Sequence, residues 1–393
     1  MYLFNPDNDL ALANFGENYM PPLSARKIGE DLTVLPVWYA PSGSCVLSDN
    51  QLDAEFLARM NGLFQLDAKL LKYADLTGWN KPIYPWGWNP TLRKRLLNLG
   101  VEIEMVPSKQ YLTTVHDYSN RKHAVAIHRE LLGLNQLFCG DPHFFTDVDS
   151  VLYYLSKQSD DCVLKMPLSG SGKGLVWIKN GITDKQTDWC RKVILNQNGV
   201  VAEPVLCREQ DFAMEFSMHN CQVSFEGYSL FNSASSGAYM GNQLLSDKEI
   251  EHVLSKYVAV DELNDLRDGL LQKLKVFFPD YVGFLGVDMM ICNIDGKFYV
   301  HPCLEVNMRM NMGLVAHRIK ERFVNEQSGG FFGINYFKRE FDALLFEQQM
   351  IKENQPEIYN NQIFSGYLPL NPVDKNTRYV AYALIKKNDV LLT

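Results

Sequence analysis

The chain has 393 residues, of which 46% are hydrophobic and 21% charged, so it is long enough for two or three domains and is not disordered. The formal net charge of -8 argues against nucleic acid as the main partner, because phosphate contacts need a surplus of Lys and Arg. None of the eight cysteines forms a C-x-x-C pair, a pattern typical of buried reduced thiols. We find neither a signal peptide nor an apolar stretch of membrane-spanning length, and therefore expect a cytoplasmic protein without a membrane partner.

The first segment, residues 1–115, has the pattern of a small α/β domain. Asn89 and Pro90 suit the start of a helix over 90–99, and Gly100 suits its end. Strands are expected at residues 1–4, 32–39 and 101–106.

Residues 116–330 form the second predicted domain, with a boundary near residue 200 between two subdomains. Helices are expected at residues 121–132, 149–156 and 263–278. Strands are expected at residues 162–167, 175–179, 200–203, 212–218, 221–231, 282–291 and 297–306. The Asp295-Gly296 step predicts that the last two strands form a hairpin. A C-terminal segment, residues 331–393, ends in a strand over 379–385.

A glycine-rich turn at residues 168–174 joins two of these strands and leaves backbone N–H groups uncovered, as a phosphate cradle requires. A P-loop is excluded because Pro167 and Gly174 stand where Gly and Ser or Thr are needed. A dinucleotide fingerprint is excluded because a strand follows the turn instead of a helix. We expect a lid over a nucleotide, with Lys165 binding phosphate oxygens, although a plain hairpin with a solvated lysine explains the pattern as well.

Two acidic residues lie within the predicted strands of the hairpin at residues 282–306. Asp288 sits inside an apolar strand, and Glu305 and Asn307 share one side of the returning strand because they are two residues apart. Arg309 would share that side if the strand continued. Oxygen ligands without His or Cys suit Mg²⁺ or Mn²⁺ held together with phosphates. The alternative is a salt-bridged sheet edge in which Arg309 neutralises both carboxylates.

Taken together, these residues resemble the ATP-grasp superfamily in their order along residues 116–320. The resemblance implies an ATP-grasp fold of α+β subdomains, within an α/β class, preceded here by an N-terminal α/β domain of the pre-ATP-grasp kind. It implies Asp288, Glu305 and Asn307 as metal ligands and Arg309 as the phosphate-binding arginine, with Lys165 as the second catalytic cation. The nucleotide residues that it implies are Lys122, Lys165, Gly170, Gly172, Gly174, Glu203, Val205, Leu206 and Asp211. Arg121 and Lys109 compete with Lys122 for the role of the early cation.

The sequence departs from the family pattern in two places. Gly286 stands where the peptide-ligase branch has arginine, so the pattern is more similar to the carboxylase and purine-biosynthesis branches. Met308 replaces the usual proline between Asn307 and Arg309.

The resemblance implies ATP- and Mg²⁺-dependent ligation of a small carboxylate to an amine through an acyl phosphate, with release of ADP. A phosphotransferase of the same fold, and a nucleotide-binding module without turnover, are the alternatives. Family members are often dimers, so a homodimer is compatible with the resemblance. His301 lies near the metal strand and could face either the site or the core, and we favour a structural role.

Overall fold

The computed structural model describes residues 1–170, 174–234 and 236–387, and within them the chain forms two compact units. Unit 1 comprises Met1–Leu112, Met240–Glu249 and Arg309–Thr393. Unit 2 comprises Thr113–Tyr239 and Ile250–Met308. The first border lies close to the predicted boundary at residue 115. Residues 309–330, which were predicted to belong to the second domain, lie in unit 1 together with the C-terminal segment.

Unit 2 holds two sheets and the helices that cover them. The smaller sheet has the order β5-β8-β6-β7, and the larger one has the antiparallel order β13-β12-β9-β10. The strands are β5 (His143–Phe145), β6 (Cys162–Lys165), β7 (Leu175–Ile178), β8 (Val200–Pro204), β9 (Arg208–His219), β10 (Gln222–Ser233), β12 (Gly283–Ile294) and β13 (Lys297–Asn307). The helices are α6 (Arg121–Leu132), α7 (Val148–Lys157), α8 (Asp184–Gln197) and α10 (Val260–Phe277).

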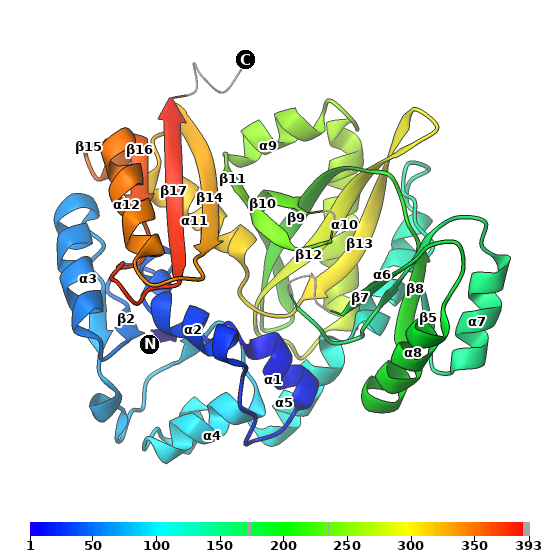
Figure 1. Cartoon of the computed structure of the whole chain (residues 1–393), viewed down its shortest axis with the longest axis horizontal. Coiled ribbons are helices and arrows are strands. Elements are labelled where there is room, and N and C mark those ends of the chain that lie inside the picture. Colours follow the sequence, from blue (N-terminus) through cyan, green and yellow to red (C-terminus); the bar gives the residue numbers. More distant parts are fainter. Residues whose placement is uncertain (171–173, 235, 388–393) are drawn as a thin grey trace. The chain divides into compact units, whose positions relative to one another are not determined.

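The helices of unit 2 start where the sequence provides capping residues. Asp147 accepts the N–H of Ser150 at the start of α7, and Thr183 and Gln186 form a capping box at the start of α8. In Figure 1, α7 and α8 lie against the smaller sheet. On the larger sheet, α6 packs on β13 and α10 packs on β10.

Unit 1 combines a parallel sheet of order β3-β2-β1-β4 with an antiparallel sheet of order β11-β14-β17-β16-β15. The strands are β1 (Tyr2–Leu3), β2 (Cys45–Leu47), β3 (Lys69–Leu71), β4 (Tyr84–Pro85), β11 (Tyr239–Leu244, its first residue in unit 2), β14 (Ser328–Tyr336), β15 (Glu357–Tyr359), β16 (Gln362–Pro369) and β17 (Tyr379–Lys387). The helices are α1 (Asn8–Asn14), α2 (Leu23–Asp31), α3 (Gln51–Phe64), α4 (Pro90–Asn98), α11 (Met312–Phe323), α12 (Asp342–Glu353) and the 3₁₀ turns η1 (Leu35–Trp38), η2 (Tyr73–Leu76) and η3 (Ile103–Met105). Two helices, α5 (Lys109–Tyr118) and α9 (Asp247–Leu254), cross the borders between the units.

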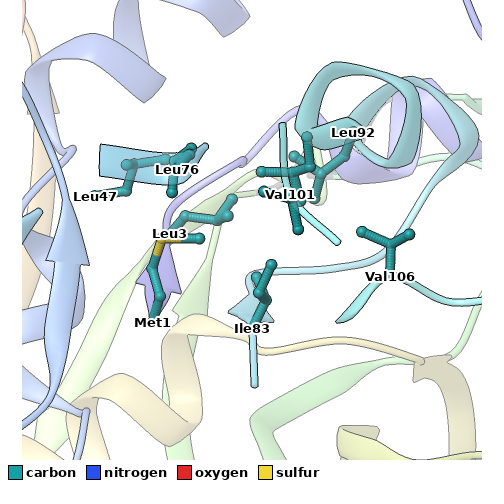
Figure 2. Packing of buried hydrophobic residues seen from close by; sticks show 9 residues of the cluster. Met1, Leu3, Leu47, Leu76, Ile83, Leu92, Val101 and Val106 are labelled. Atoms are coloured by element: carbon teal, nitrogen blue, oxygen red, sulfur yellow. The ribbon is translucent and has the colours of Figure 1, made fainter. Parts of the chain in front are cut away.

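Side chains of the parallel sheet of unit 1 form an apolar core with those of neighbouring elements. Figure 2 shows Met1 and Leu3 packed with side chains from β2, η2, α4 and the segments next to them. Residues far apart in the sequence close the same unit: the Trp38 indole donates to the Leu370 carbonyl at 2.8 Å, and Asp31 accepts the N–H groups of Arg378 and Tyr379.

Most predicted elements are present, and the α/β class is confirmed. Two predicted strands are wrong. Residues 32–39 contain η1, because Pro36 lacks an N–H for a ladder and the buried residues 34–39 have no paired strand. Residues 101–106 contain η3, in which Ile103 is half exposed and therefore does not share a buried face with Val101.

Among the described helices, none is both long enough and apolar enough to cross a membrane.

Candidate active site

The β12–β13 hairpin brings the three predicted metal ligands together. Asp295 and Gly296 both have positive φ in the tight turn that joins the strands. Asp288 and Glu305 are direct partners across the two strands, so their side chains share one face of the sheet. Asn307 lies two residues further on that face and donates from Nδ2 to Asp288 Oδ2 at 3.0 Å. Two carboxylates and one carboxamide therefore meet at a single place.

A bulge in β13 lies directly before this group. The register is Asp288 with Glu305 and then Met290 with His301, so that residues 302–304 face only Met289. Pro302, which lacks an N–H, is tolerated at such an irregularity. Because the shift is an even number of residues, His301 stays on the same face as Asp288 and Glu305.

Arg121, at the start of α6, connects the hairpin to the glycine-rich turn. Its Nη2 lies 2.6 Å from Glu305 Oε1, and its side chain is only 7% exposed. Its Nη1 donates to the Met166 carbonyl and, at 2.7 Å, to Ser169 Oγ. One guanidinium therefore contacts both Glu305, one of the predicted metal ligands, and Ser169 in the predicted lid.

Lys122 faces elsewhere. Neighbouring residues differ by about 100° around a helix, so Arg121 and Lys122 cannot address the same place. The Lys122 ammonium pairs with Asp117, near the surface. Of these two cations, Arg121 is therefore the one that lies next to the acidic group. The sequence shows a cation at each of these positions but not which one points inward.

Lys165, the last residue of β6, forms an ion pair with Glu203 on the neighbouring strand β8. Both side chains are largely buried, and the second carboxylate oxygen of Glu203 lies 3.8 Å from His301 Nε2. After β8, the Val205 N–H donates to the Asp161 carbonyl at 2.8 Å, which fixes the start of the segment that continues to Leu206.

Asp211, one of the predicted nucleotide residues, lies on β9 and pairs with Arg208 at 3.1 Å. Burial raises the pKa of Asp211, and Arg208 and Ser233 oppose that effect.

The described part of the glycine-rich turn is held at both ends. Met166 N–H donates to the Gly174 carbonyl at 2.9 Å, and Gly174 has a φ of +84°, which disfavours any residue with a Cβ. The Gln197 carboxamide accepts from Leu168 N–H at 2.8 Å and donates to its carbonyl at 3.1 Å, a contact that no sequence motif predicted. Gly170 is half-buried, and Gly172 lies outside the described residues.

Arg309 lies in unit 1, two residues beyond the end of β13. Because the strand ends at Asn307, the condition under which Arg309 would share its side is not met. The guanidinium instead makes a bidentate ion pair with Asp9, with distances of 2.6 Å and 2.7 Å. This contact is local to unit 1, and the role of Arg309 stays a prediction.

The donor set at the hairpin suits a hard cation. No group of three or more His, Cys, Asp or Glu residues that could hold a metal exists among the described residues. Mg²⁺ does not require such a group, because it is usually held by one or two carboxylates together with substrate phosphates. Asp288 and Glu305 meet that requirement, and the amide of Asn307 adds one oxygen to the set.

Comparison with known proteins shows a likeness in structure but not in sequence. No family model matches the chain, and no curated protein matches it either. The structure is similar to N5-carboxyaminoimidazole synthetase from Staphylococcus aureus complexed with ADP, with a TM-score of 0.50 at 12% identity, over 90% of this chain and 96% of that one. It is also similar to biotin carboxylase from Campylobacter jejuni in an ATP complex, with a TM-score of 0.52 at 9% identity, over 90% of each chain.

These structural neighbours show the fold of the chain. The chain has the ATP-grasp fold, as the order of its motifs predicted. At these levels of identity the likeness concerns the fold alone.

Proposed function

We propose that this chain is an ATP- and Mg²⁺-dependent ligase that joins a small carboxylate to an amine through an acyl phosphate. The main support is the meeting of Asp288, Glu305 and Asn307 on one hairpin, with Arg121 linking them to the glycine-rich turn. A sheet edge built only for stability would not need an arginine that also holds a loop rich in glycine.

Nucleotide binding would use unit 2. Lys165 would exchange Glu203 for phosphate oxygens, and the backbone of Gly170, Gly172 and Gly174 would cover the phosphates. The segment from Glu203 through Val205 to Leu206 would read the adenine edge, and Asp211 would bind the ribose. These roles follow the family pattern, with Arg121 in place of Lys122 as the early cation.

Asp288, Glu305 and Asn307 would hold the metal. Bound Mg²⁺ neutralises part of the phosphate charge, as it does in other phosphoryl-transfer enzymes. In the present arrangement Glu305 pairs with Arg121. Release of this pair would make both groups available at once, a carboxylate for the cation and a guanidinium for phosphate.

The reaction has two steps. A carboxylate oxygen attacks the γ-phosphorus of ATP, the bond from that phosphorus to the bridging oxygen breaks, and ADP leaves. The amine nitrogen then attacks the acyl carbon, phosphate leaves with the electron pair of the broken C–O bond, and the nitrogen loses a proton. Exclusion of water by the glycine-rich turn would protect the acyl phosphate from hydrolysis.

The first test is calorimetry of ATP binding with and without Mg²⁺. We expect metal-dependent binding by the wild type, weaker nucleotide binding by Lys165→Ala, and loss of metal dependence in Glu305→Gln. The exposed residues Lys192 and Glu130 supply matched controls, Lys192→Ala and Glu130→Gln, which should bind as the wild type does. Absence of ATP binding by the wild type with either Mg²⁺ or Mn²⁺ would refute the proposal.

The second test separates a ligase from a phosphotransferase. Phosphate release from ATP is measured with a panel of carboxylic acids, in the presence and absence of amines. Release that requires both an acid and an amine supports the ligase. Transfer of phosphate to a hydroxyl compound without an amine supports a kinase.

A further inference from the structure

His301 has surroundings that packing alone does not explain. It lies on β13, is 2% exposed, and neither ring nitrogen has a hydrogen-bond partner in the part of the chain that the structure describes. Most buried polar groups in proteins are hydrogen-bonded, and each unpaired one costs about 1–3 kcal/mol. A leucine would fill a similar space without that cost, so the imidazole calls for an explanation.

The ring of His301 is held on two sides. The ring of His128 lies against it, with 4.5 Å between the centroids, and His128 Nε2 bonds to the Cys139 carbonyl at 2.9 Å. On another side, Gly140 approaches so closely that a Cβ there would lie 2.4 Å from His301 Cδ2. These neighbours leave His301 little freedom to turn away from Glu203.

Glu203 is the one carboxylate that an ion-pair contact joins to His301 in the described residues. Its Oε2 lies 3.8 Å from His301 Nε2, which is too long for a hydrogen bond but only about 1 Å from one. The other oxygen of Glu203 is paired with Lys165. Glu203 thus lies between two possible donors, Lys165 and His301, and is paired with Lys165 alone.

Nucleotide binding would change this balance. Under the proposed function, on which this inference rests, Lys165 turns to a phosphate and leaves the buried Glu203 carboxylate without its cation. An unpaired buried carboxylate is costly, so a second donor within reach lowers the cost of that movement.

We infer that His301 is a positioning residue, which forms a hydrogen bond to Glu203 in place of the Lys165 ion pair when Lys165 moves to a bound phosphate. The Nε2–H of His301 donates to Glu203 Oε2, and Lys165 is released at lower cost. No covalent bond changes in this exchange.

The electrostatics agree with a neutral donor. Burial, together with His128 and Lys165, lowers the pKa of His301 well below its ordinary value. A neutral imidazole carries one N–H, which is sufficient for a single bond to Glu203.

The experiment compares His301→Leu, which removes the donor, with His301→Gln, which keeps an N–H donor. We expect ATP·Mg²⁺ to bind roughly tenfold or more weakly to His301→Leu, as for loss of a hydrogen bond to a charged group, and His301→Gln to recover most of the affinity. Without ATP, His301→Leu should resist urea as well as the wild type, because it removes an unpaired polar group. In a Glu203→Gln background, the His301→Leu change should no longer affect affinity.

Each other outcome overturns the inference. The inference is wrong if His301→Leu binds ATP as tightly as the wild type. It is also wrong if His301→Leu and His301→Gln both lose affinity together with stability. If the wild type does not bind ATP, the proposed function itself fails, which is a different result from a wild type that binds and a leucine variant that binds equally well.

A spectroscopic measurement needs no variant to fold. In protein labelled with ¹⁵N-histidine, addition of ATP and Mg²⁺ should shift the Nε2 signal of His301 toward a protonated, hydrogen-bonded nitrogen. An unchanged signal in protein saturated with ATP would also overturn the inference.

Discussion

Replacement of Arg121 by methionine tests the connection between α6, the glycine-rich turn and the β12–β13 hairpin. The change removes the ion pair with Glu305 and the hydrogen bonds to Met166 and Ser169, and it keeps much of the aliphatic volume.

The magnitude follows from the burial of the two partners. Removal of one member of a buried ion pair costs about 3–5 kcal/mol. The side chain of Arg121 is 7% exposed, but that of Glu305 is 27% exposed, so water can partly hydrate the carboxylate that remains. We therefore expect a loss near the lower limit, about 3 kcal/mol.

The assay is hydrogen exchange followed by mass spectrometry. Hydrogen exchange reports the opening of individual segments, which suits a contact confined to unit 2. The opening free energy should fall in peptides that cover α6 and the β12–β13 hairpin. The same substitution at Arg129, which is exposed on the same helix, should change it by less than about 0.5 kcal/mol.

A double-mutant cycle decides whether the ion pair is the cause. Arg121→Met and Glu305→Gln should show a coupling energy of about 1–3 kcal/mol. If the two effects simply add, or if Arg121→Met changes the hairpin no more than Arg129→Met does, the reasoning from the ion pair is refuted.

Three further outcomes are expected. Gly174→Ala should destabilise the base of the glycine-rich turn by about 1–2 kcal/mol, because φ is +84° and the new Cβ would lie 3.0 Å from Met166 Sδ. Limited proteolysis should show faster cleavage in this turn. The control Gly133→Ala, where nothing lies within 4 Å of the new Cβ, should leave the cleavage rate unchanged. Burial raises the pKa of Glu347 to about 7, so the unfolded chain loses this proton first, and the free energy of unfolding should fall as pH rises from about 4.5 to 7. Urea unfolding across that range should show a smaller fall for Glu347→Gln, which is neutral at every pH. Phe341→Gly should stabilise the protein by about 1 kcal/mol and so raise the urea midpoint, because Phe341 has a φ of 67°, which strains a residue with a Cβ, and its half-exposed side chain contributes little packing. An unchanged midpoint would contradict this argument.

Local signals made part of the fold predictable. The hairpin of β12 and β13 follows from two apolar strands and the Asp295-Gly296 step, because the residues that determine it are neighbours in sequence. The start of α4 follows from Asn89, whose side chain accepts the N–H of Leu92.

Distant contacts explain what the sequence could not show. The run that contains η1 is as apolar as a buried strand, and its Trp38 donates to Leu370, which no local pattern could indicate. The pairing of the strands in the C-terminal segment was not predicted, because β14 pairs with β11 and β17, which lie far from it in the sequence.

The candidate site shows the same division. The proximity of Asp288, Glu305 and Asn307 follows from the two-residue period of a strand and was predicted. The choice between Arg121 and Lys122 depends on how α6 docks on β13, which is a tertiary contact. The position of His301 could not be predicted from the sequence, because it depends on the bulge in β13, where two extra residues decide which groups lie next to the imidazole.

The closing contacts of unit 1 bear on how the protein is made. Asp31 cannot accept the N–H of Arg378 until that residue, 347 positions later, has been synthesised. At about 5–20 residues per second, a ribosome needs roughly 20–70 s to deliver that partner. Residues 113–308, which contain all of unit 2, emerge within this interval and can fold first, while the early part of unit 1 has a partly exposed apolar surface. We expect chaperones that shield nascent chains to engage the first hundred or so residues, and the yield of folded protein to depend on how long that engagement lasts.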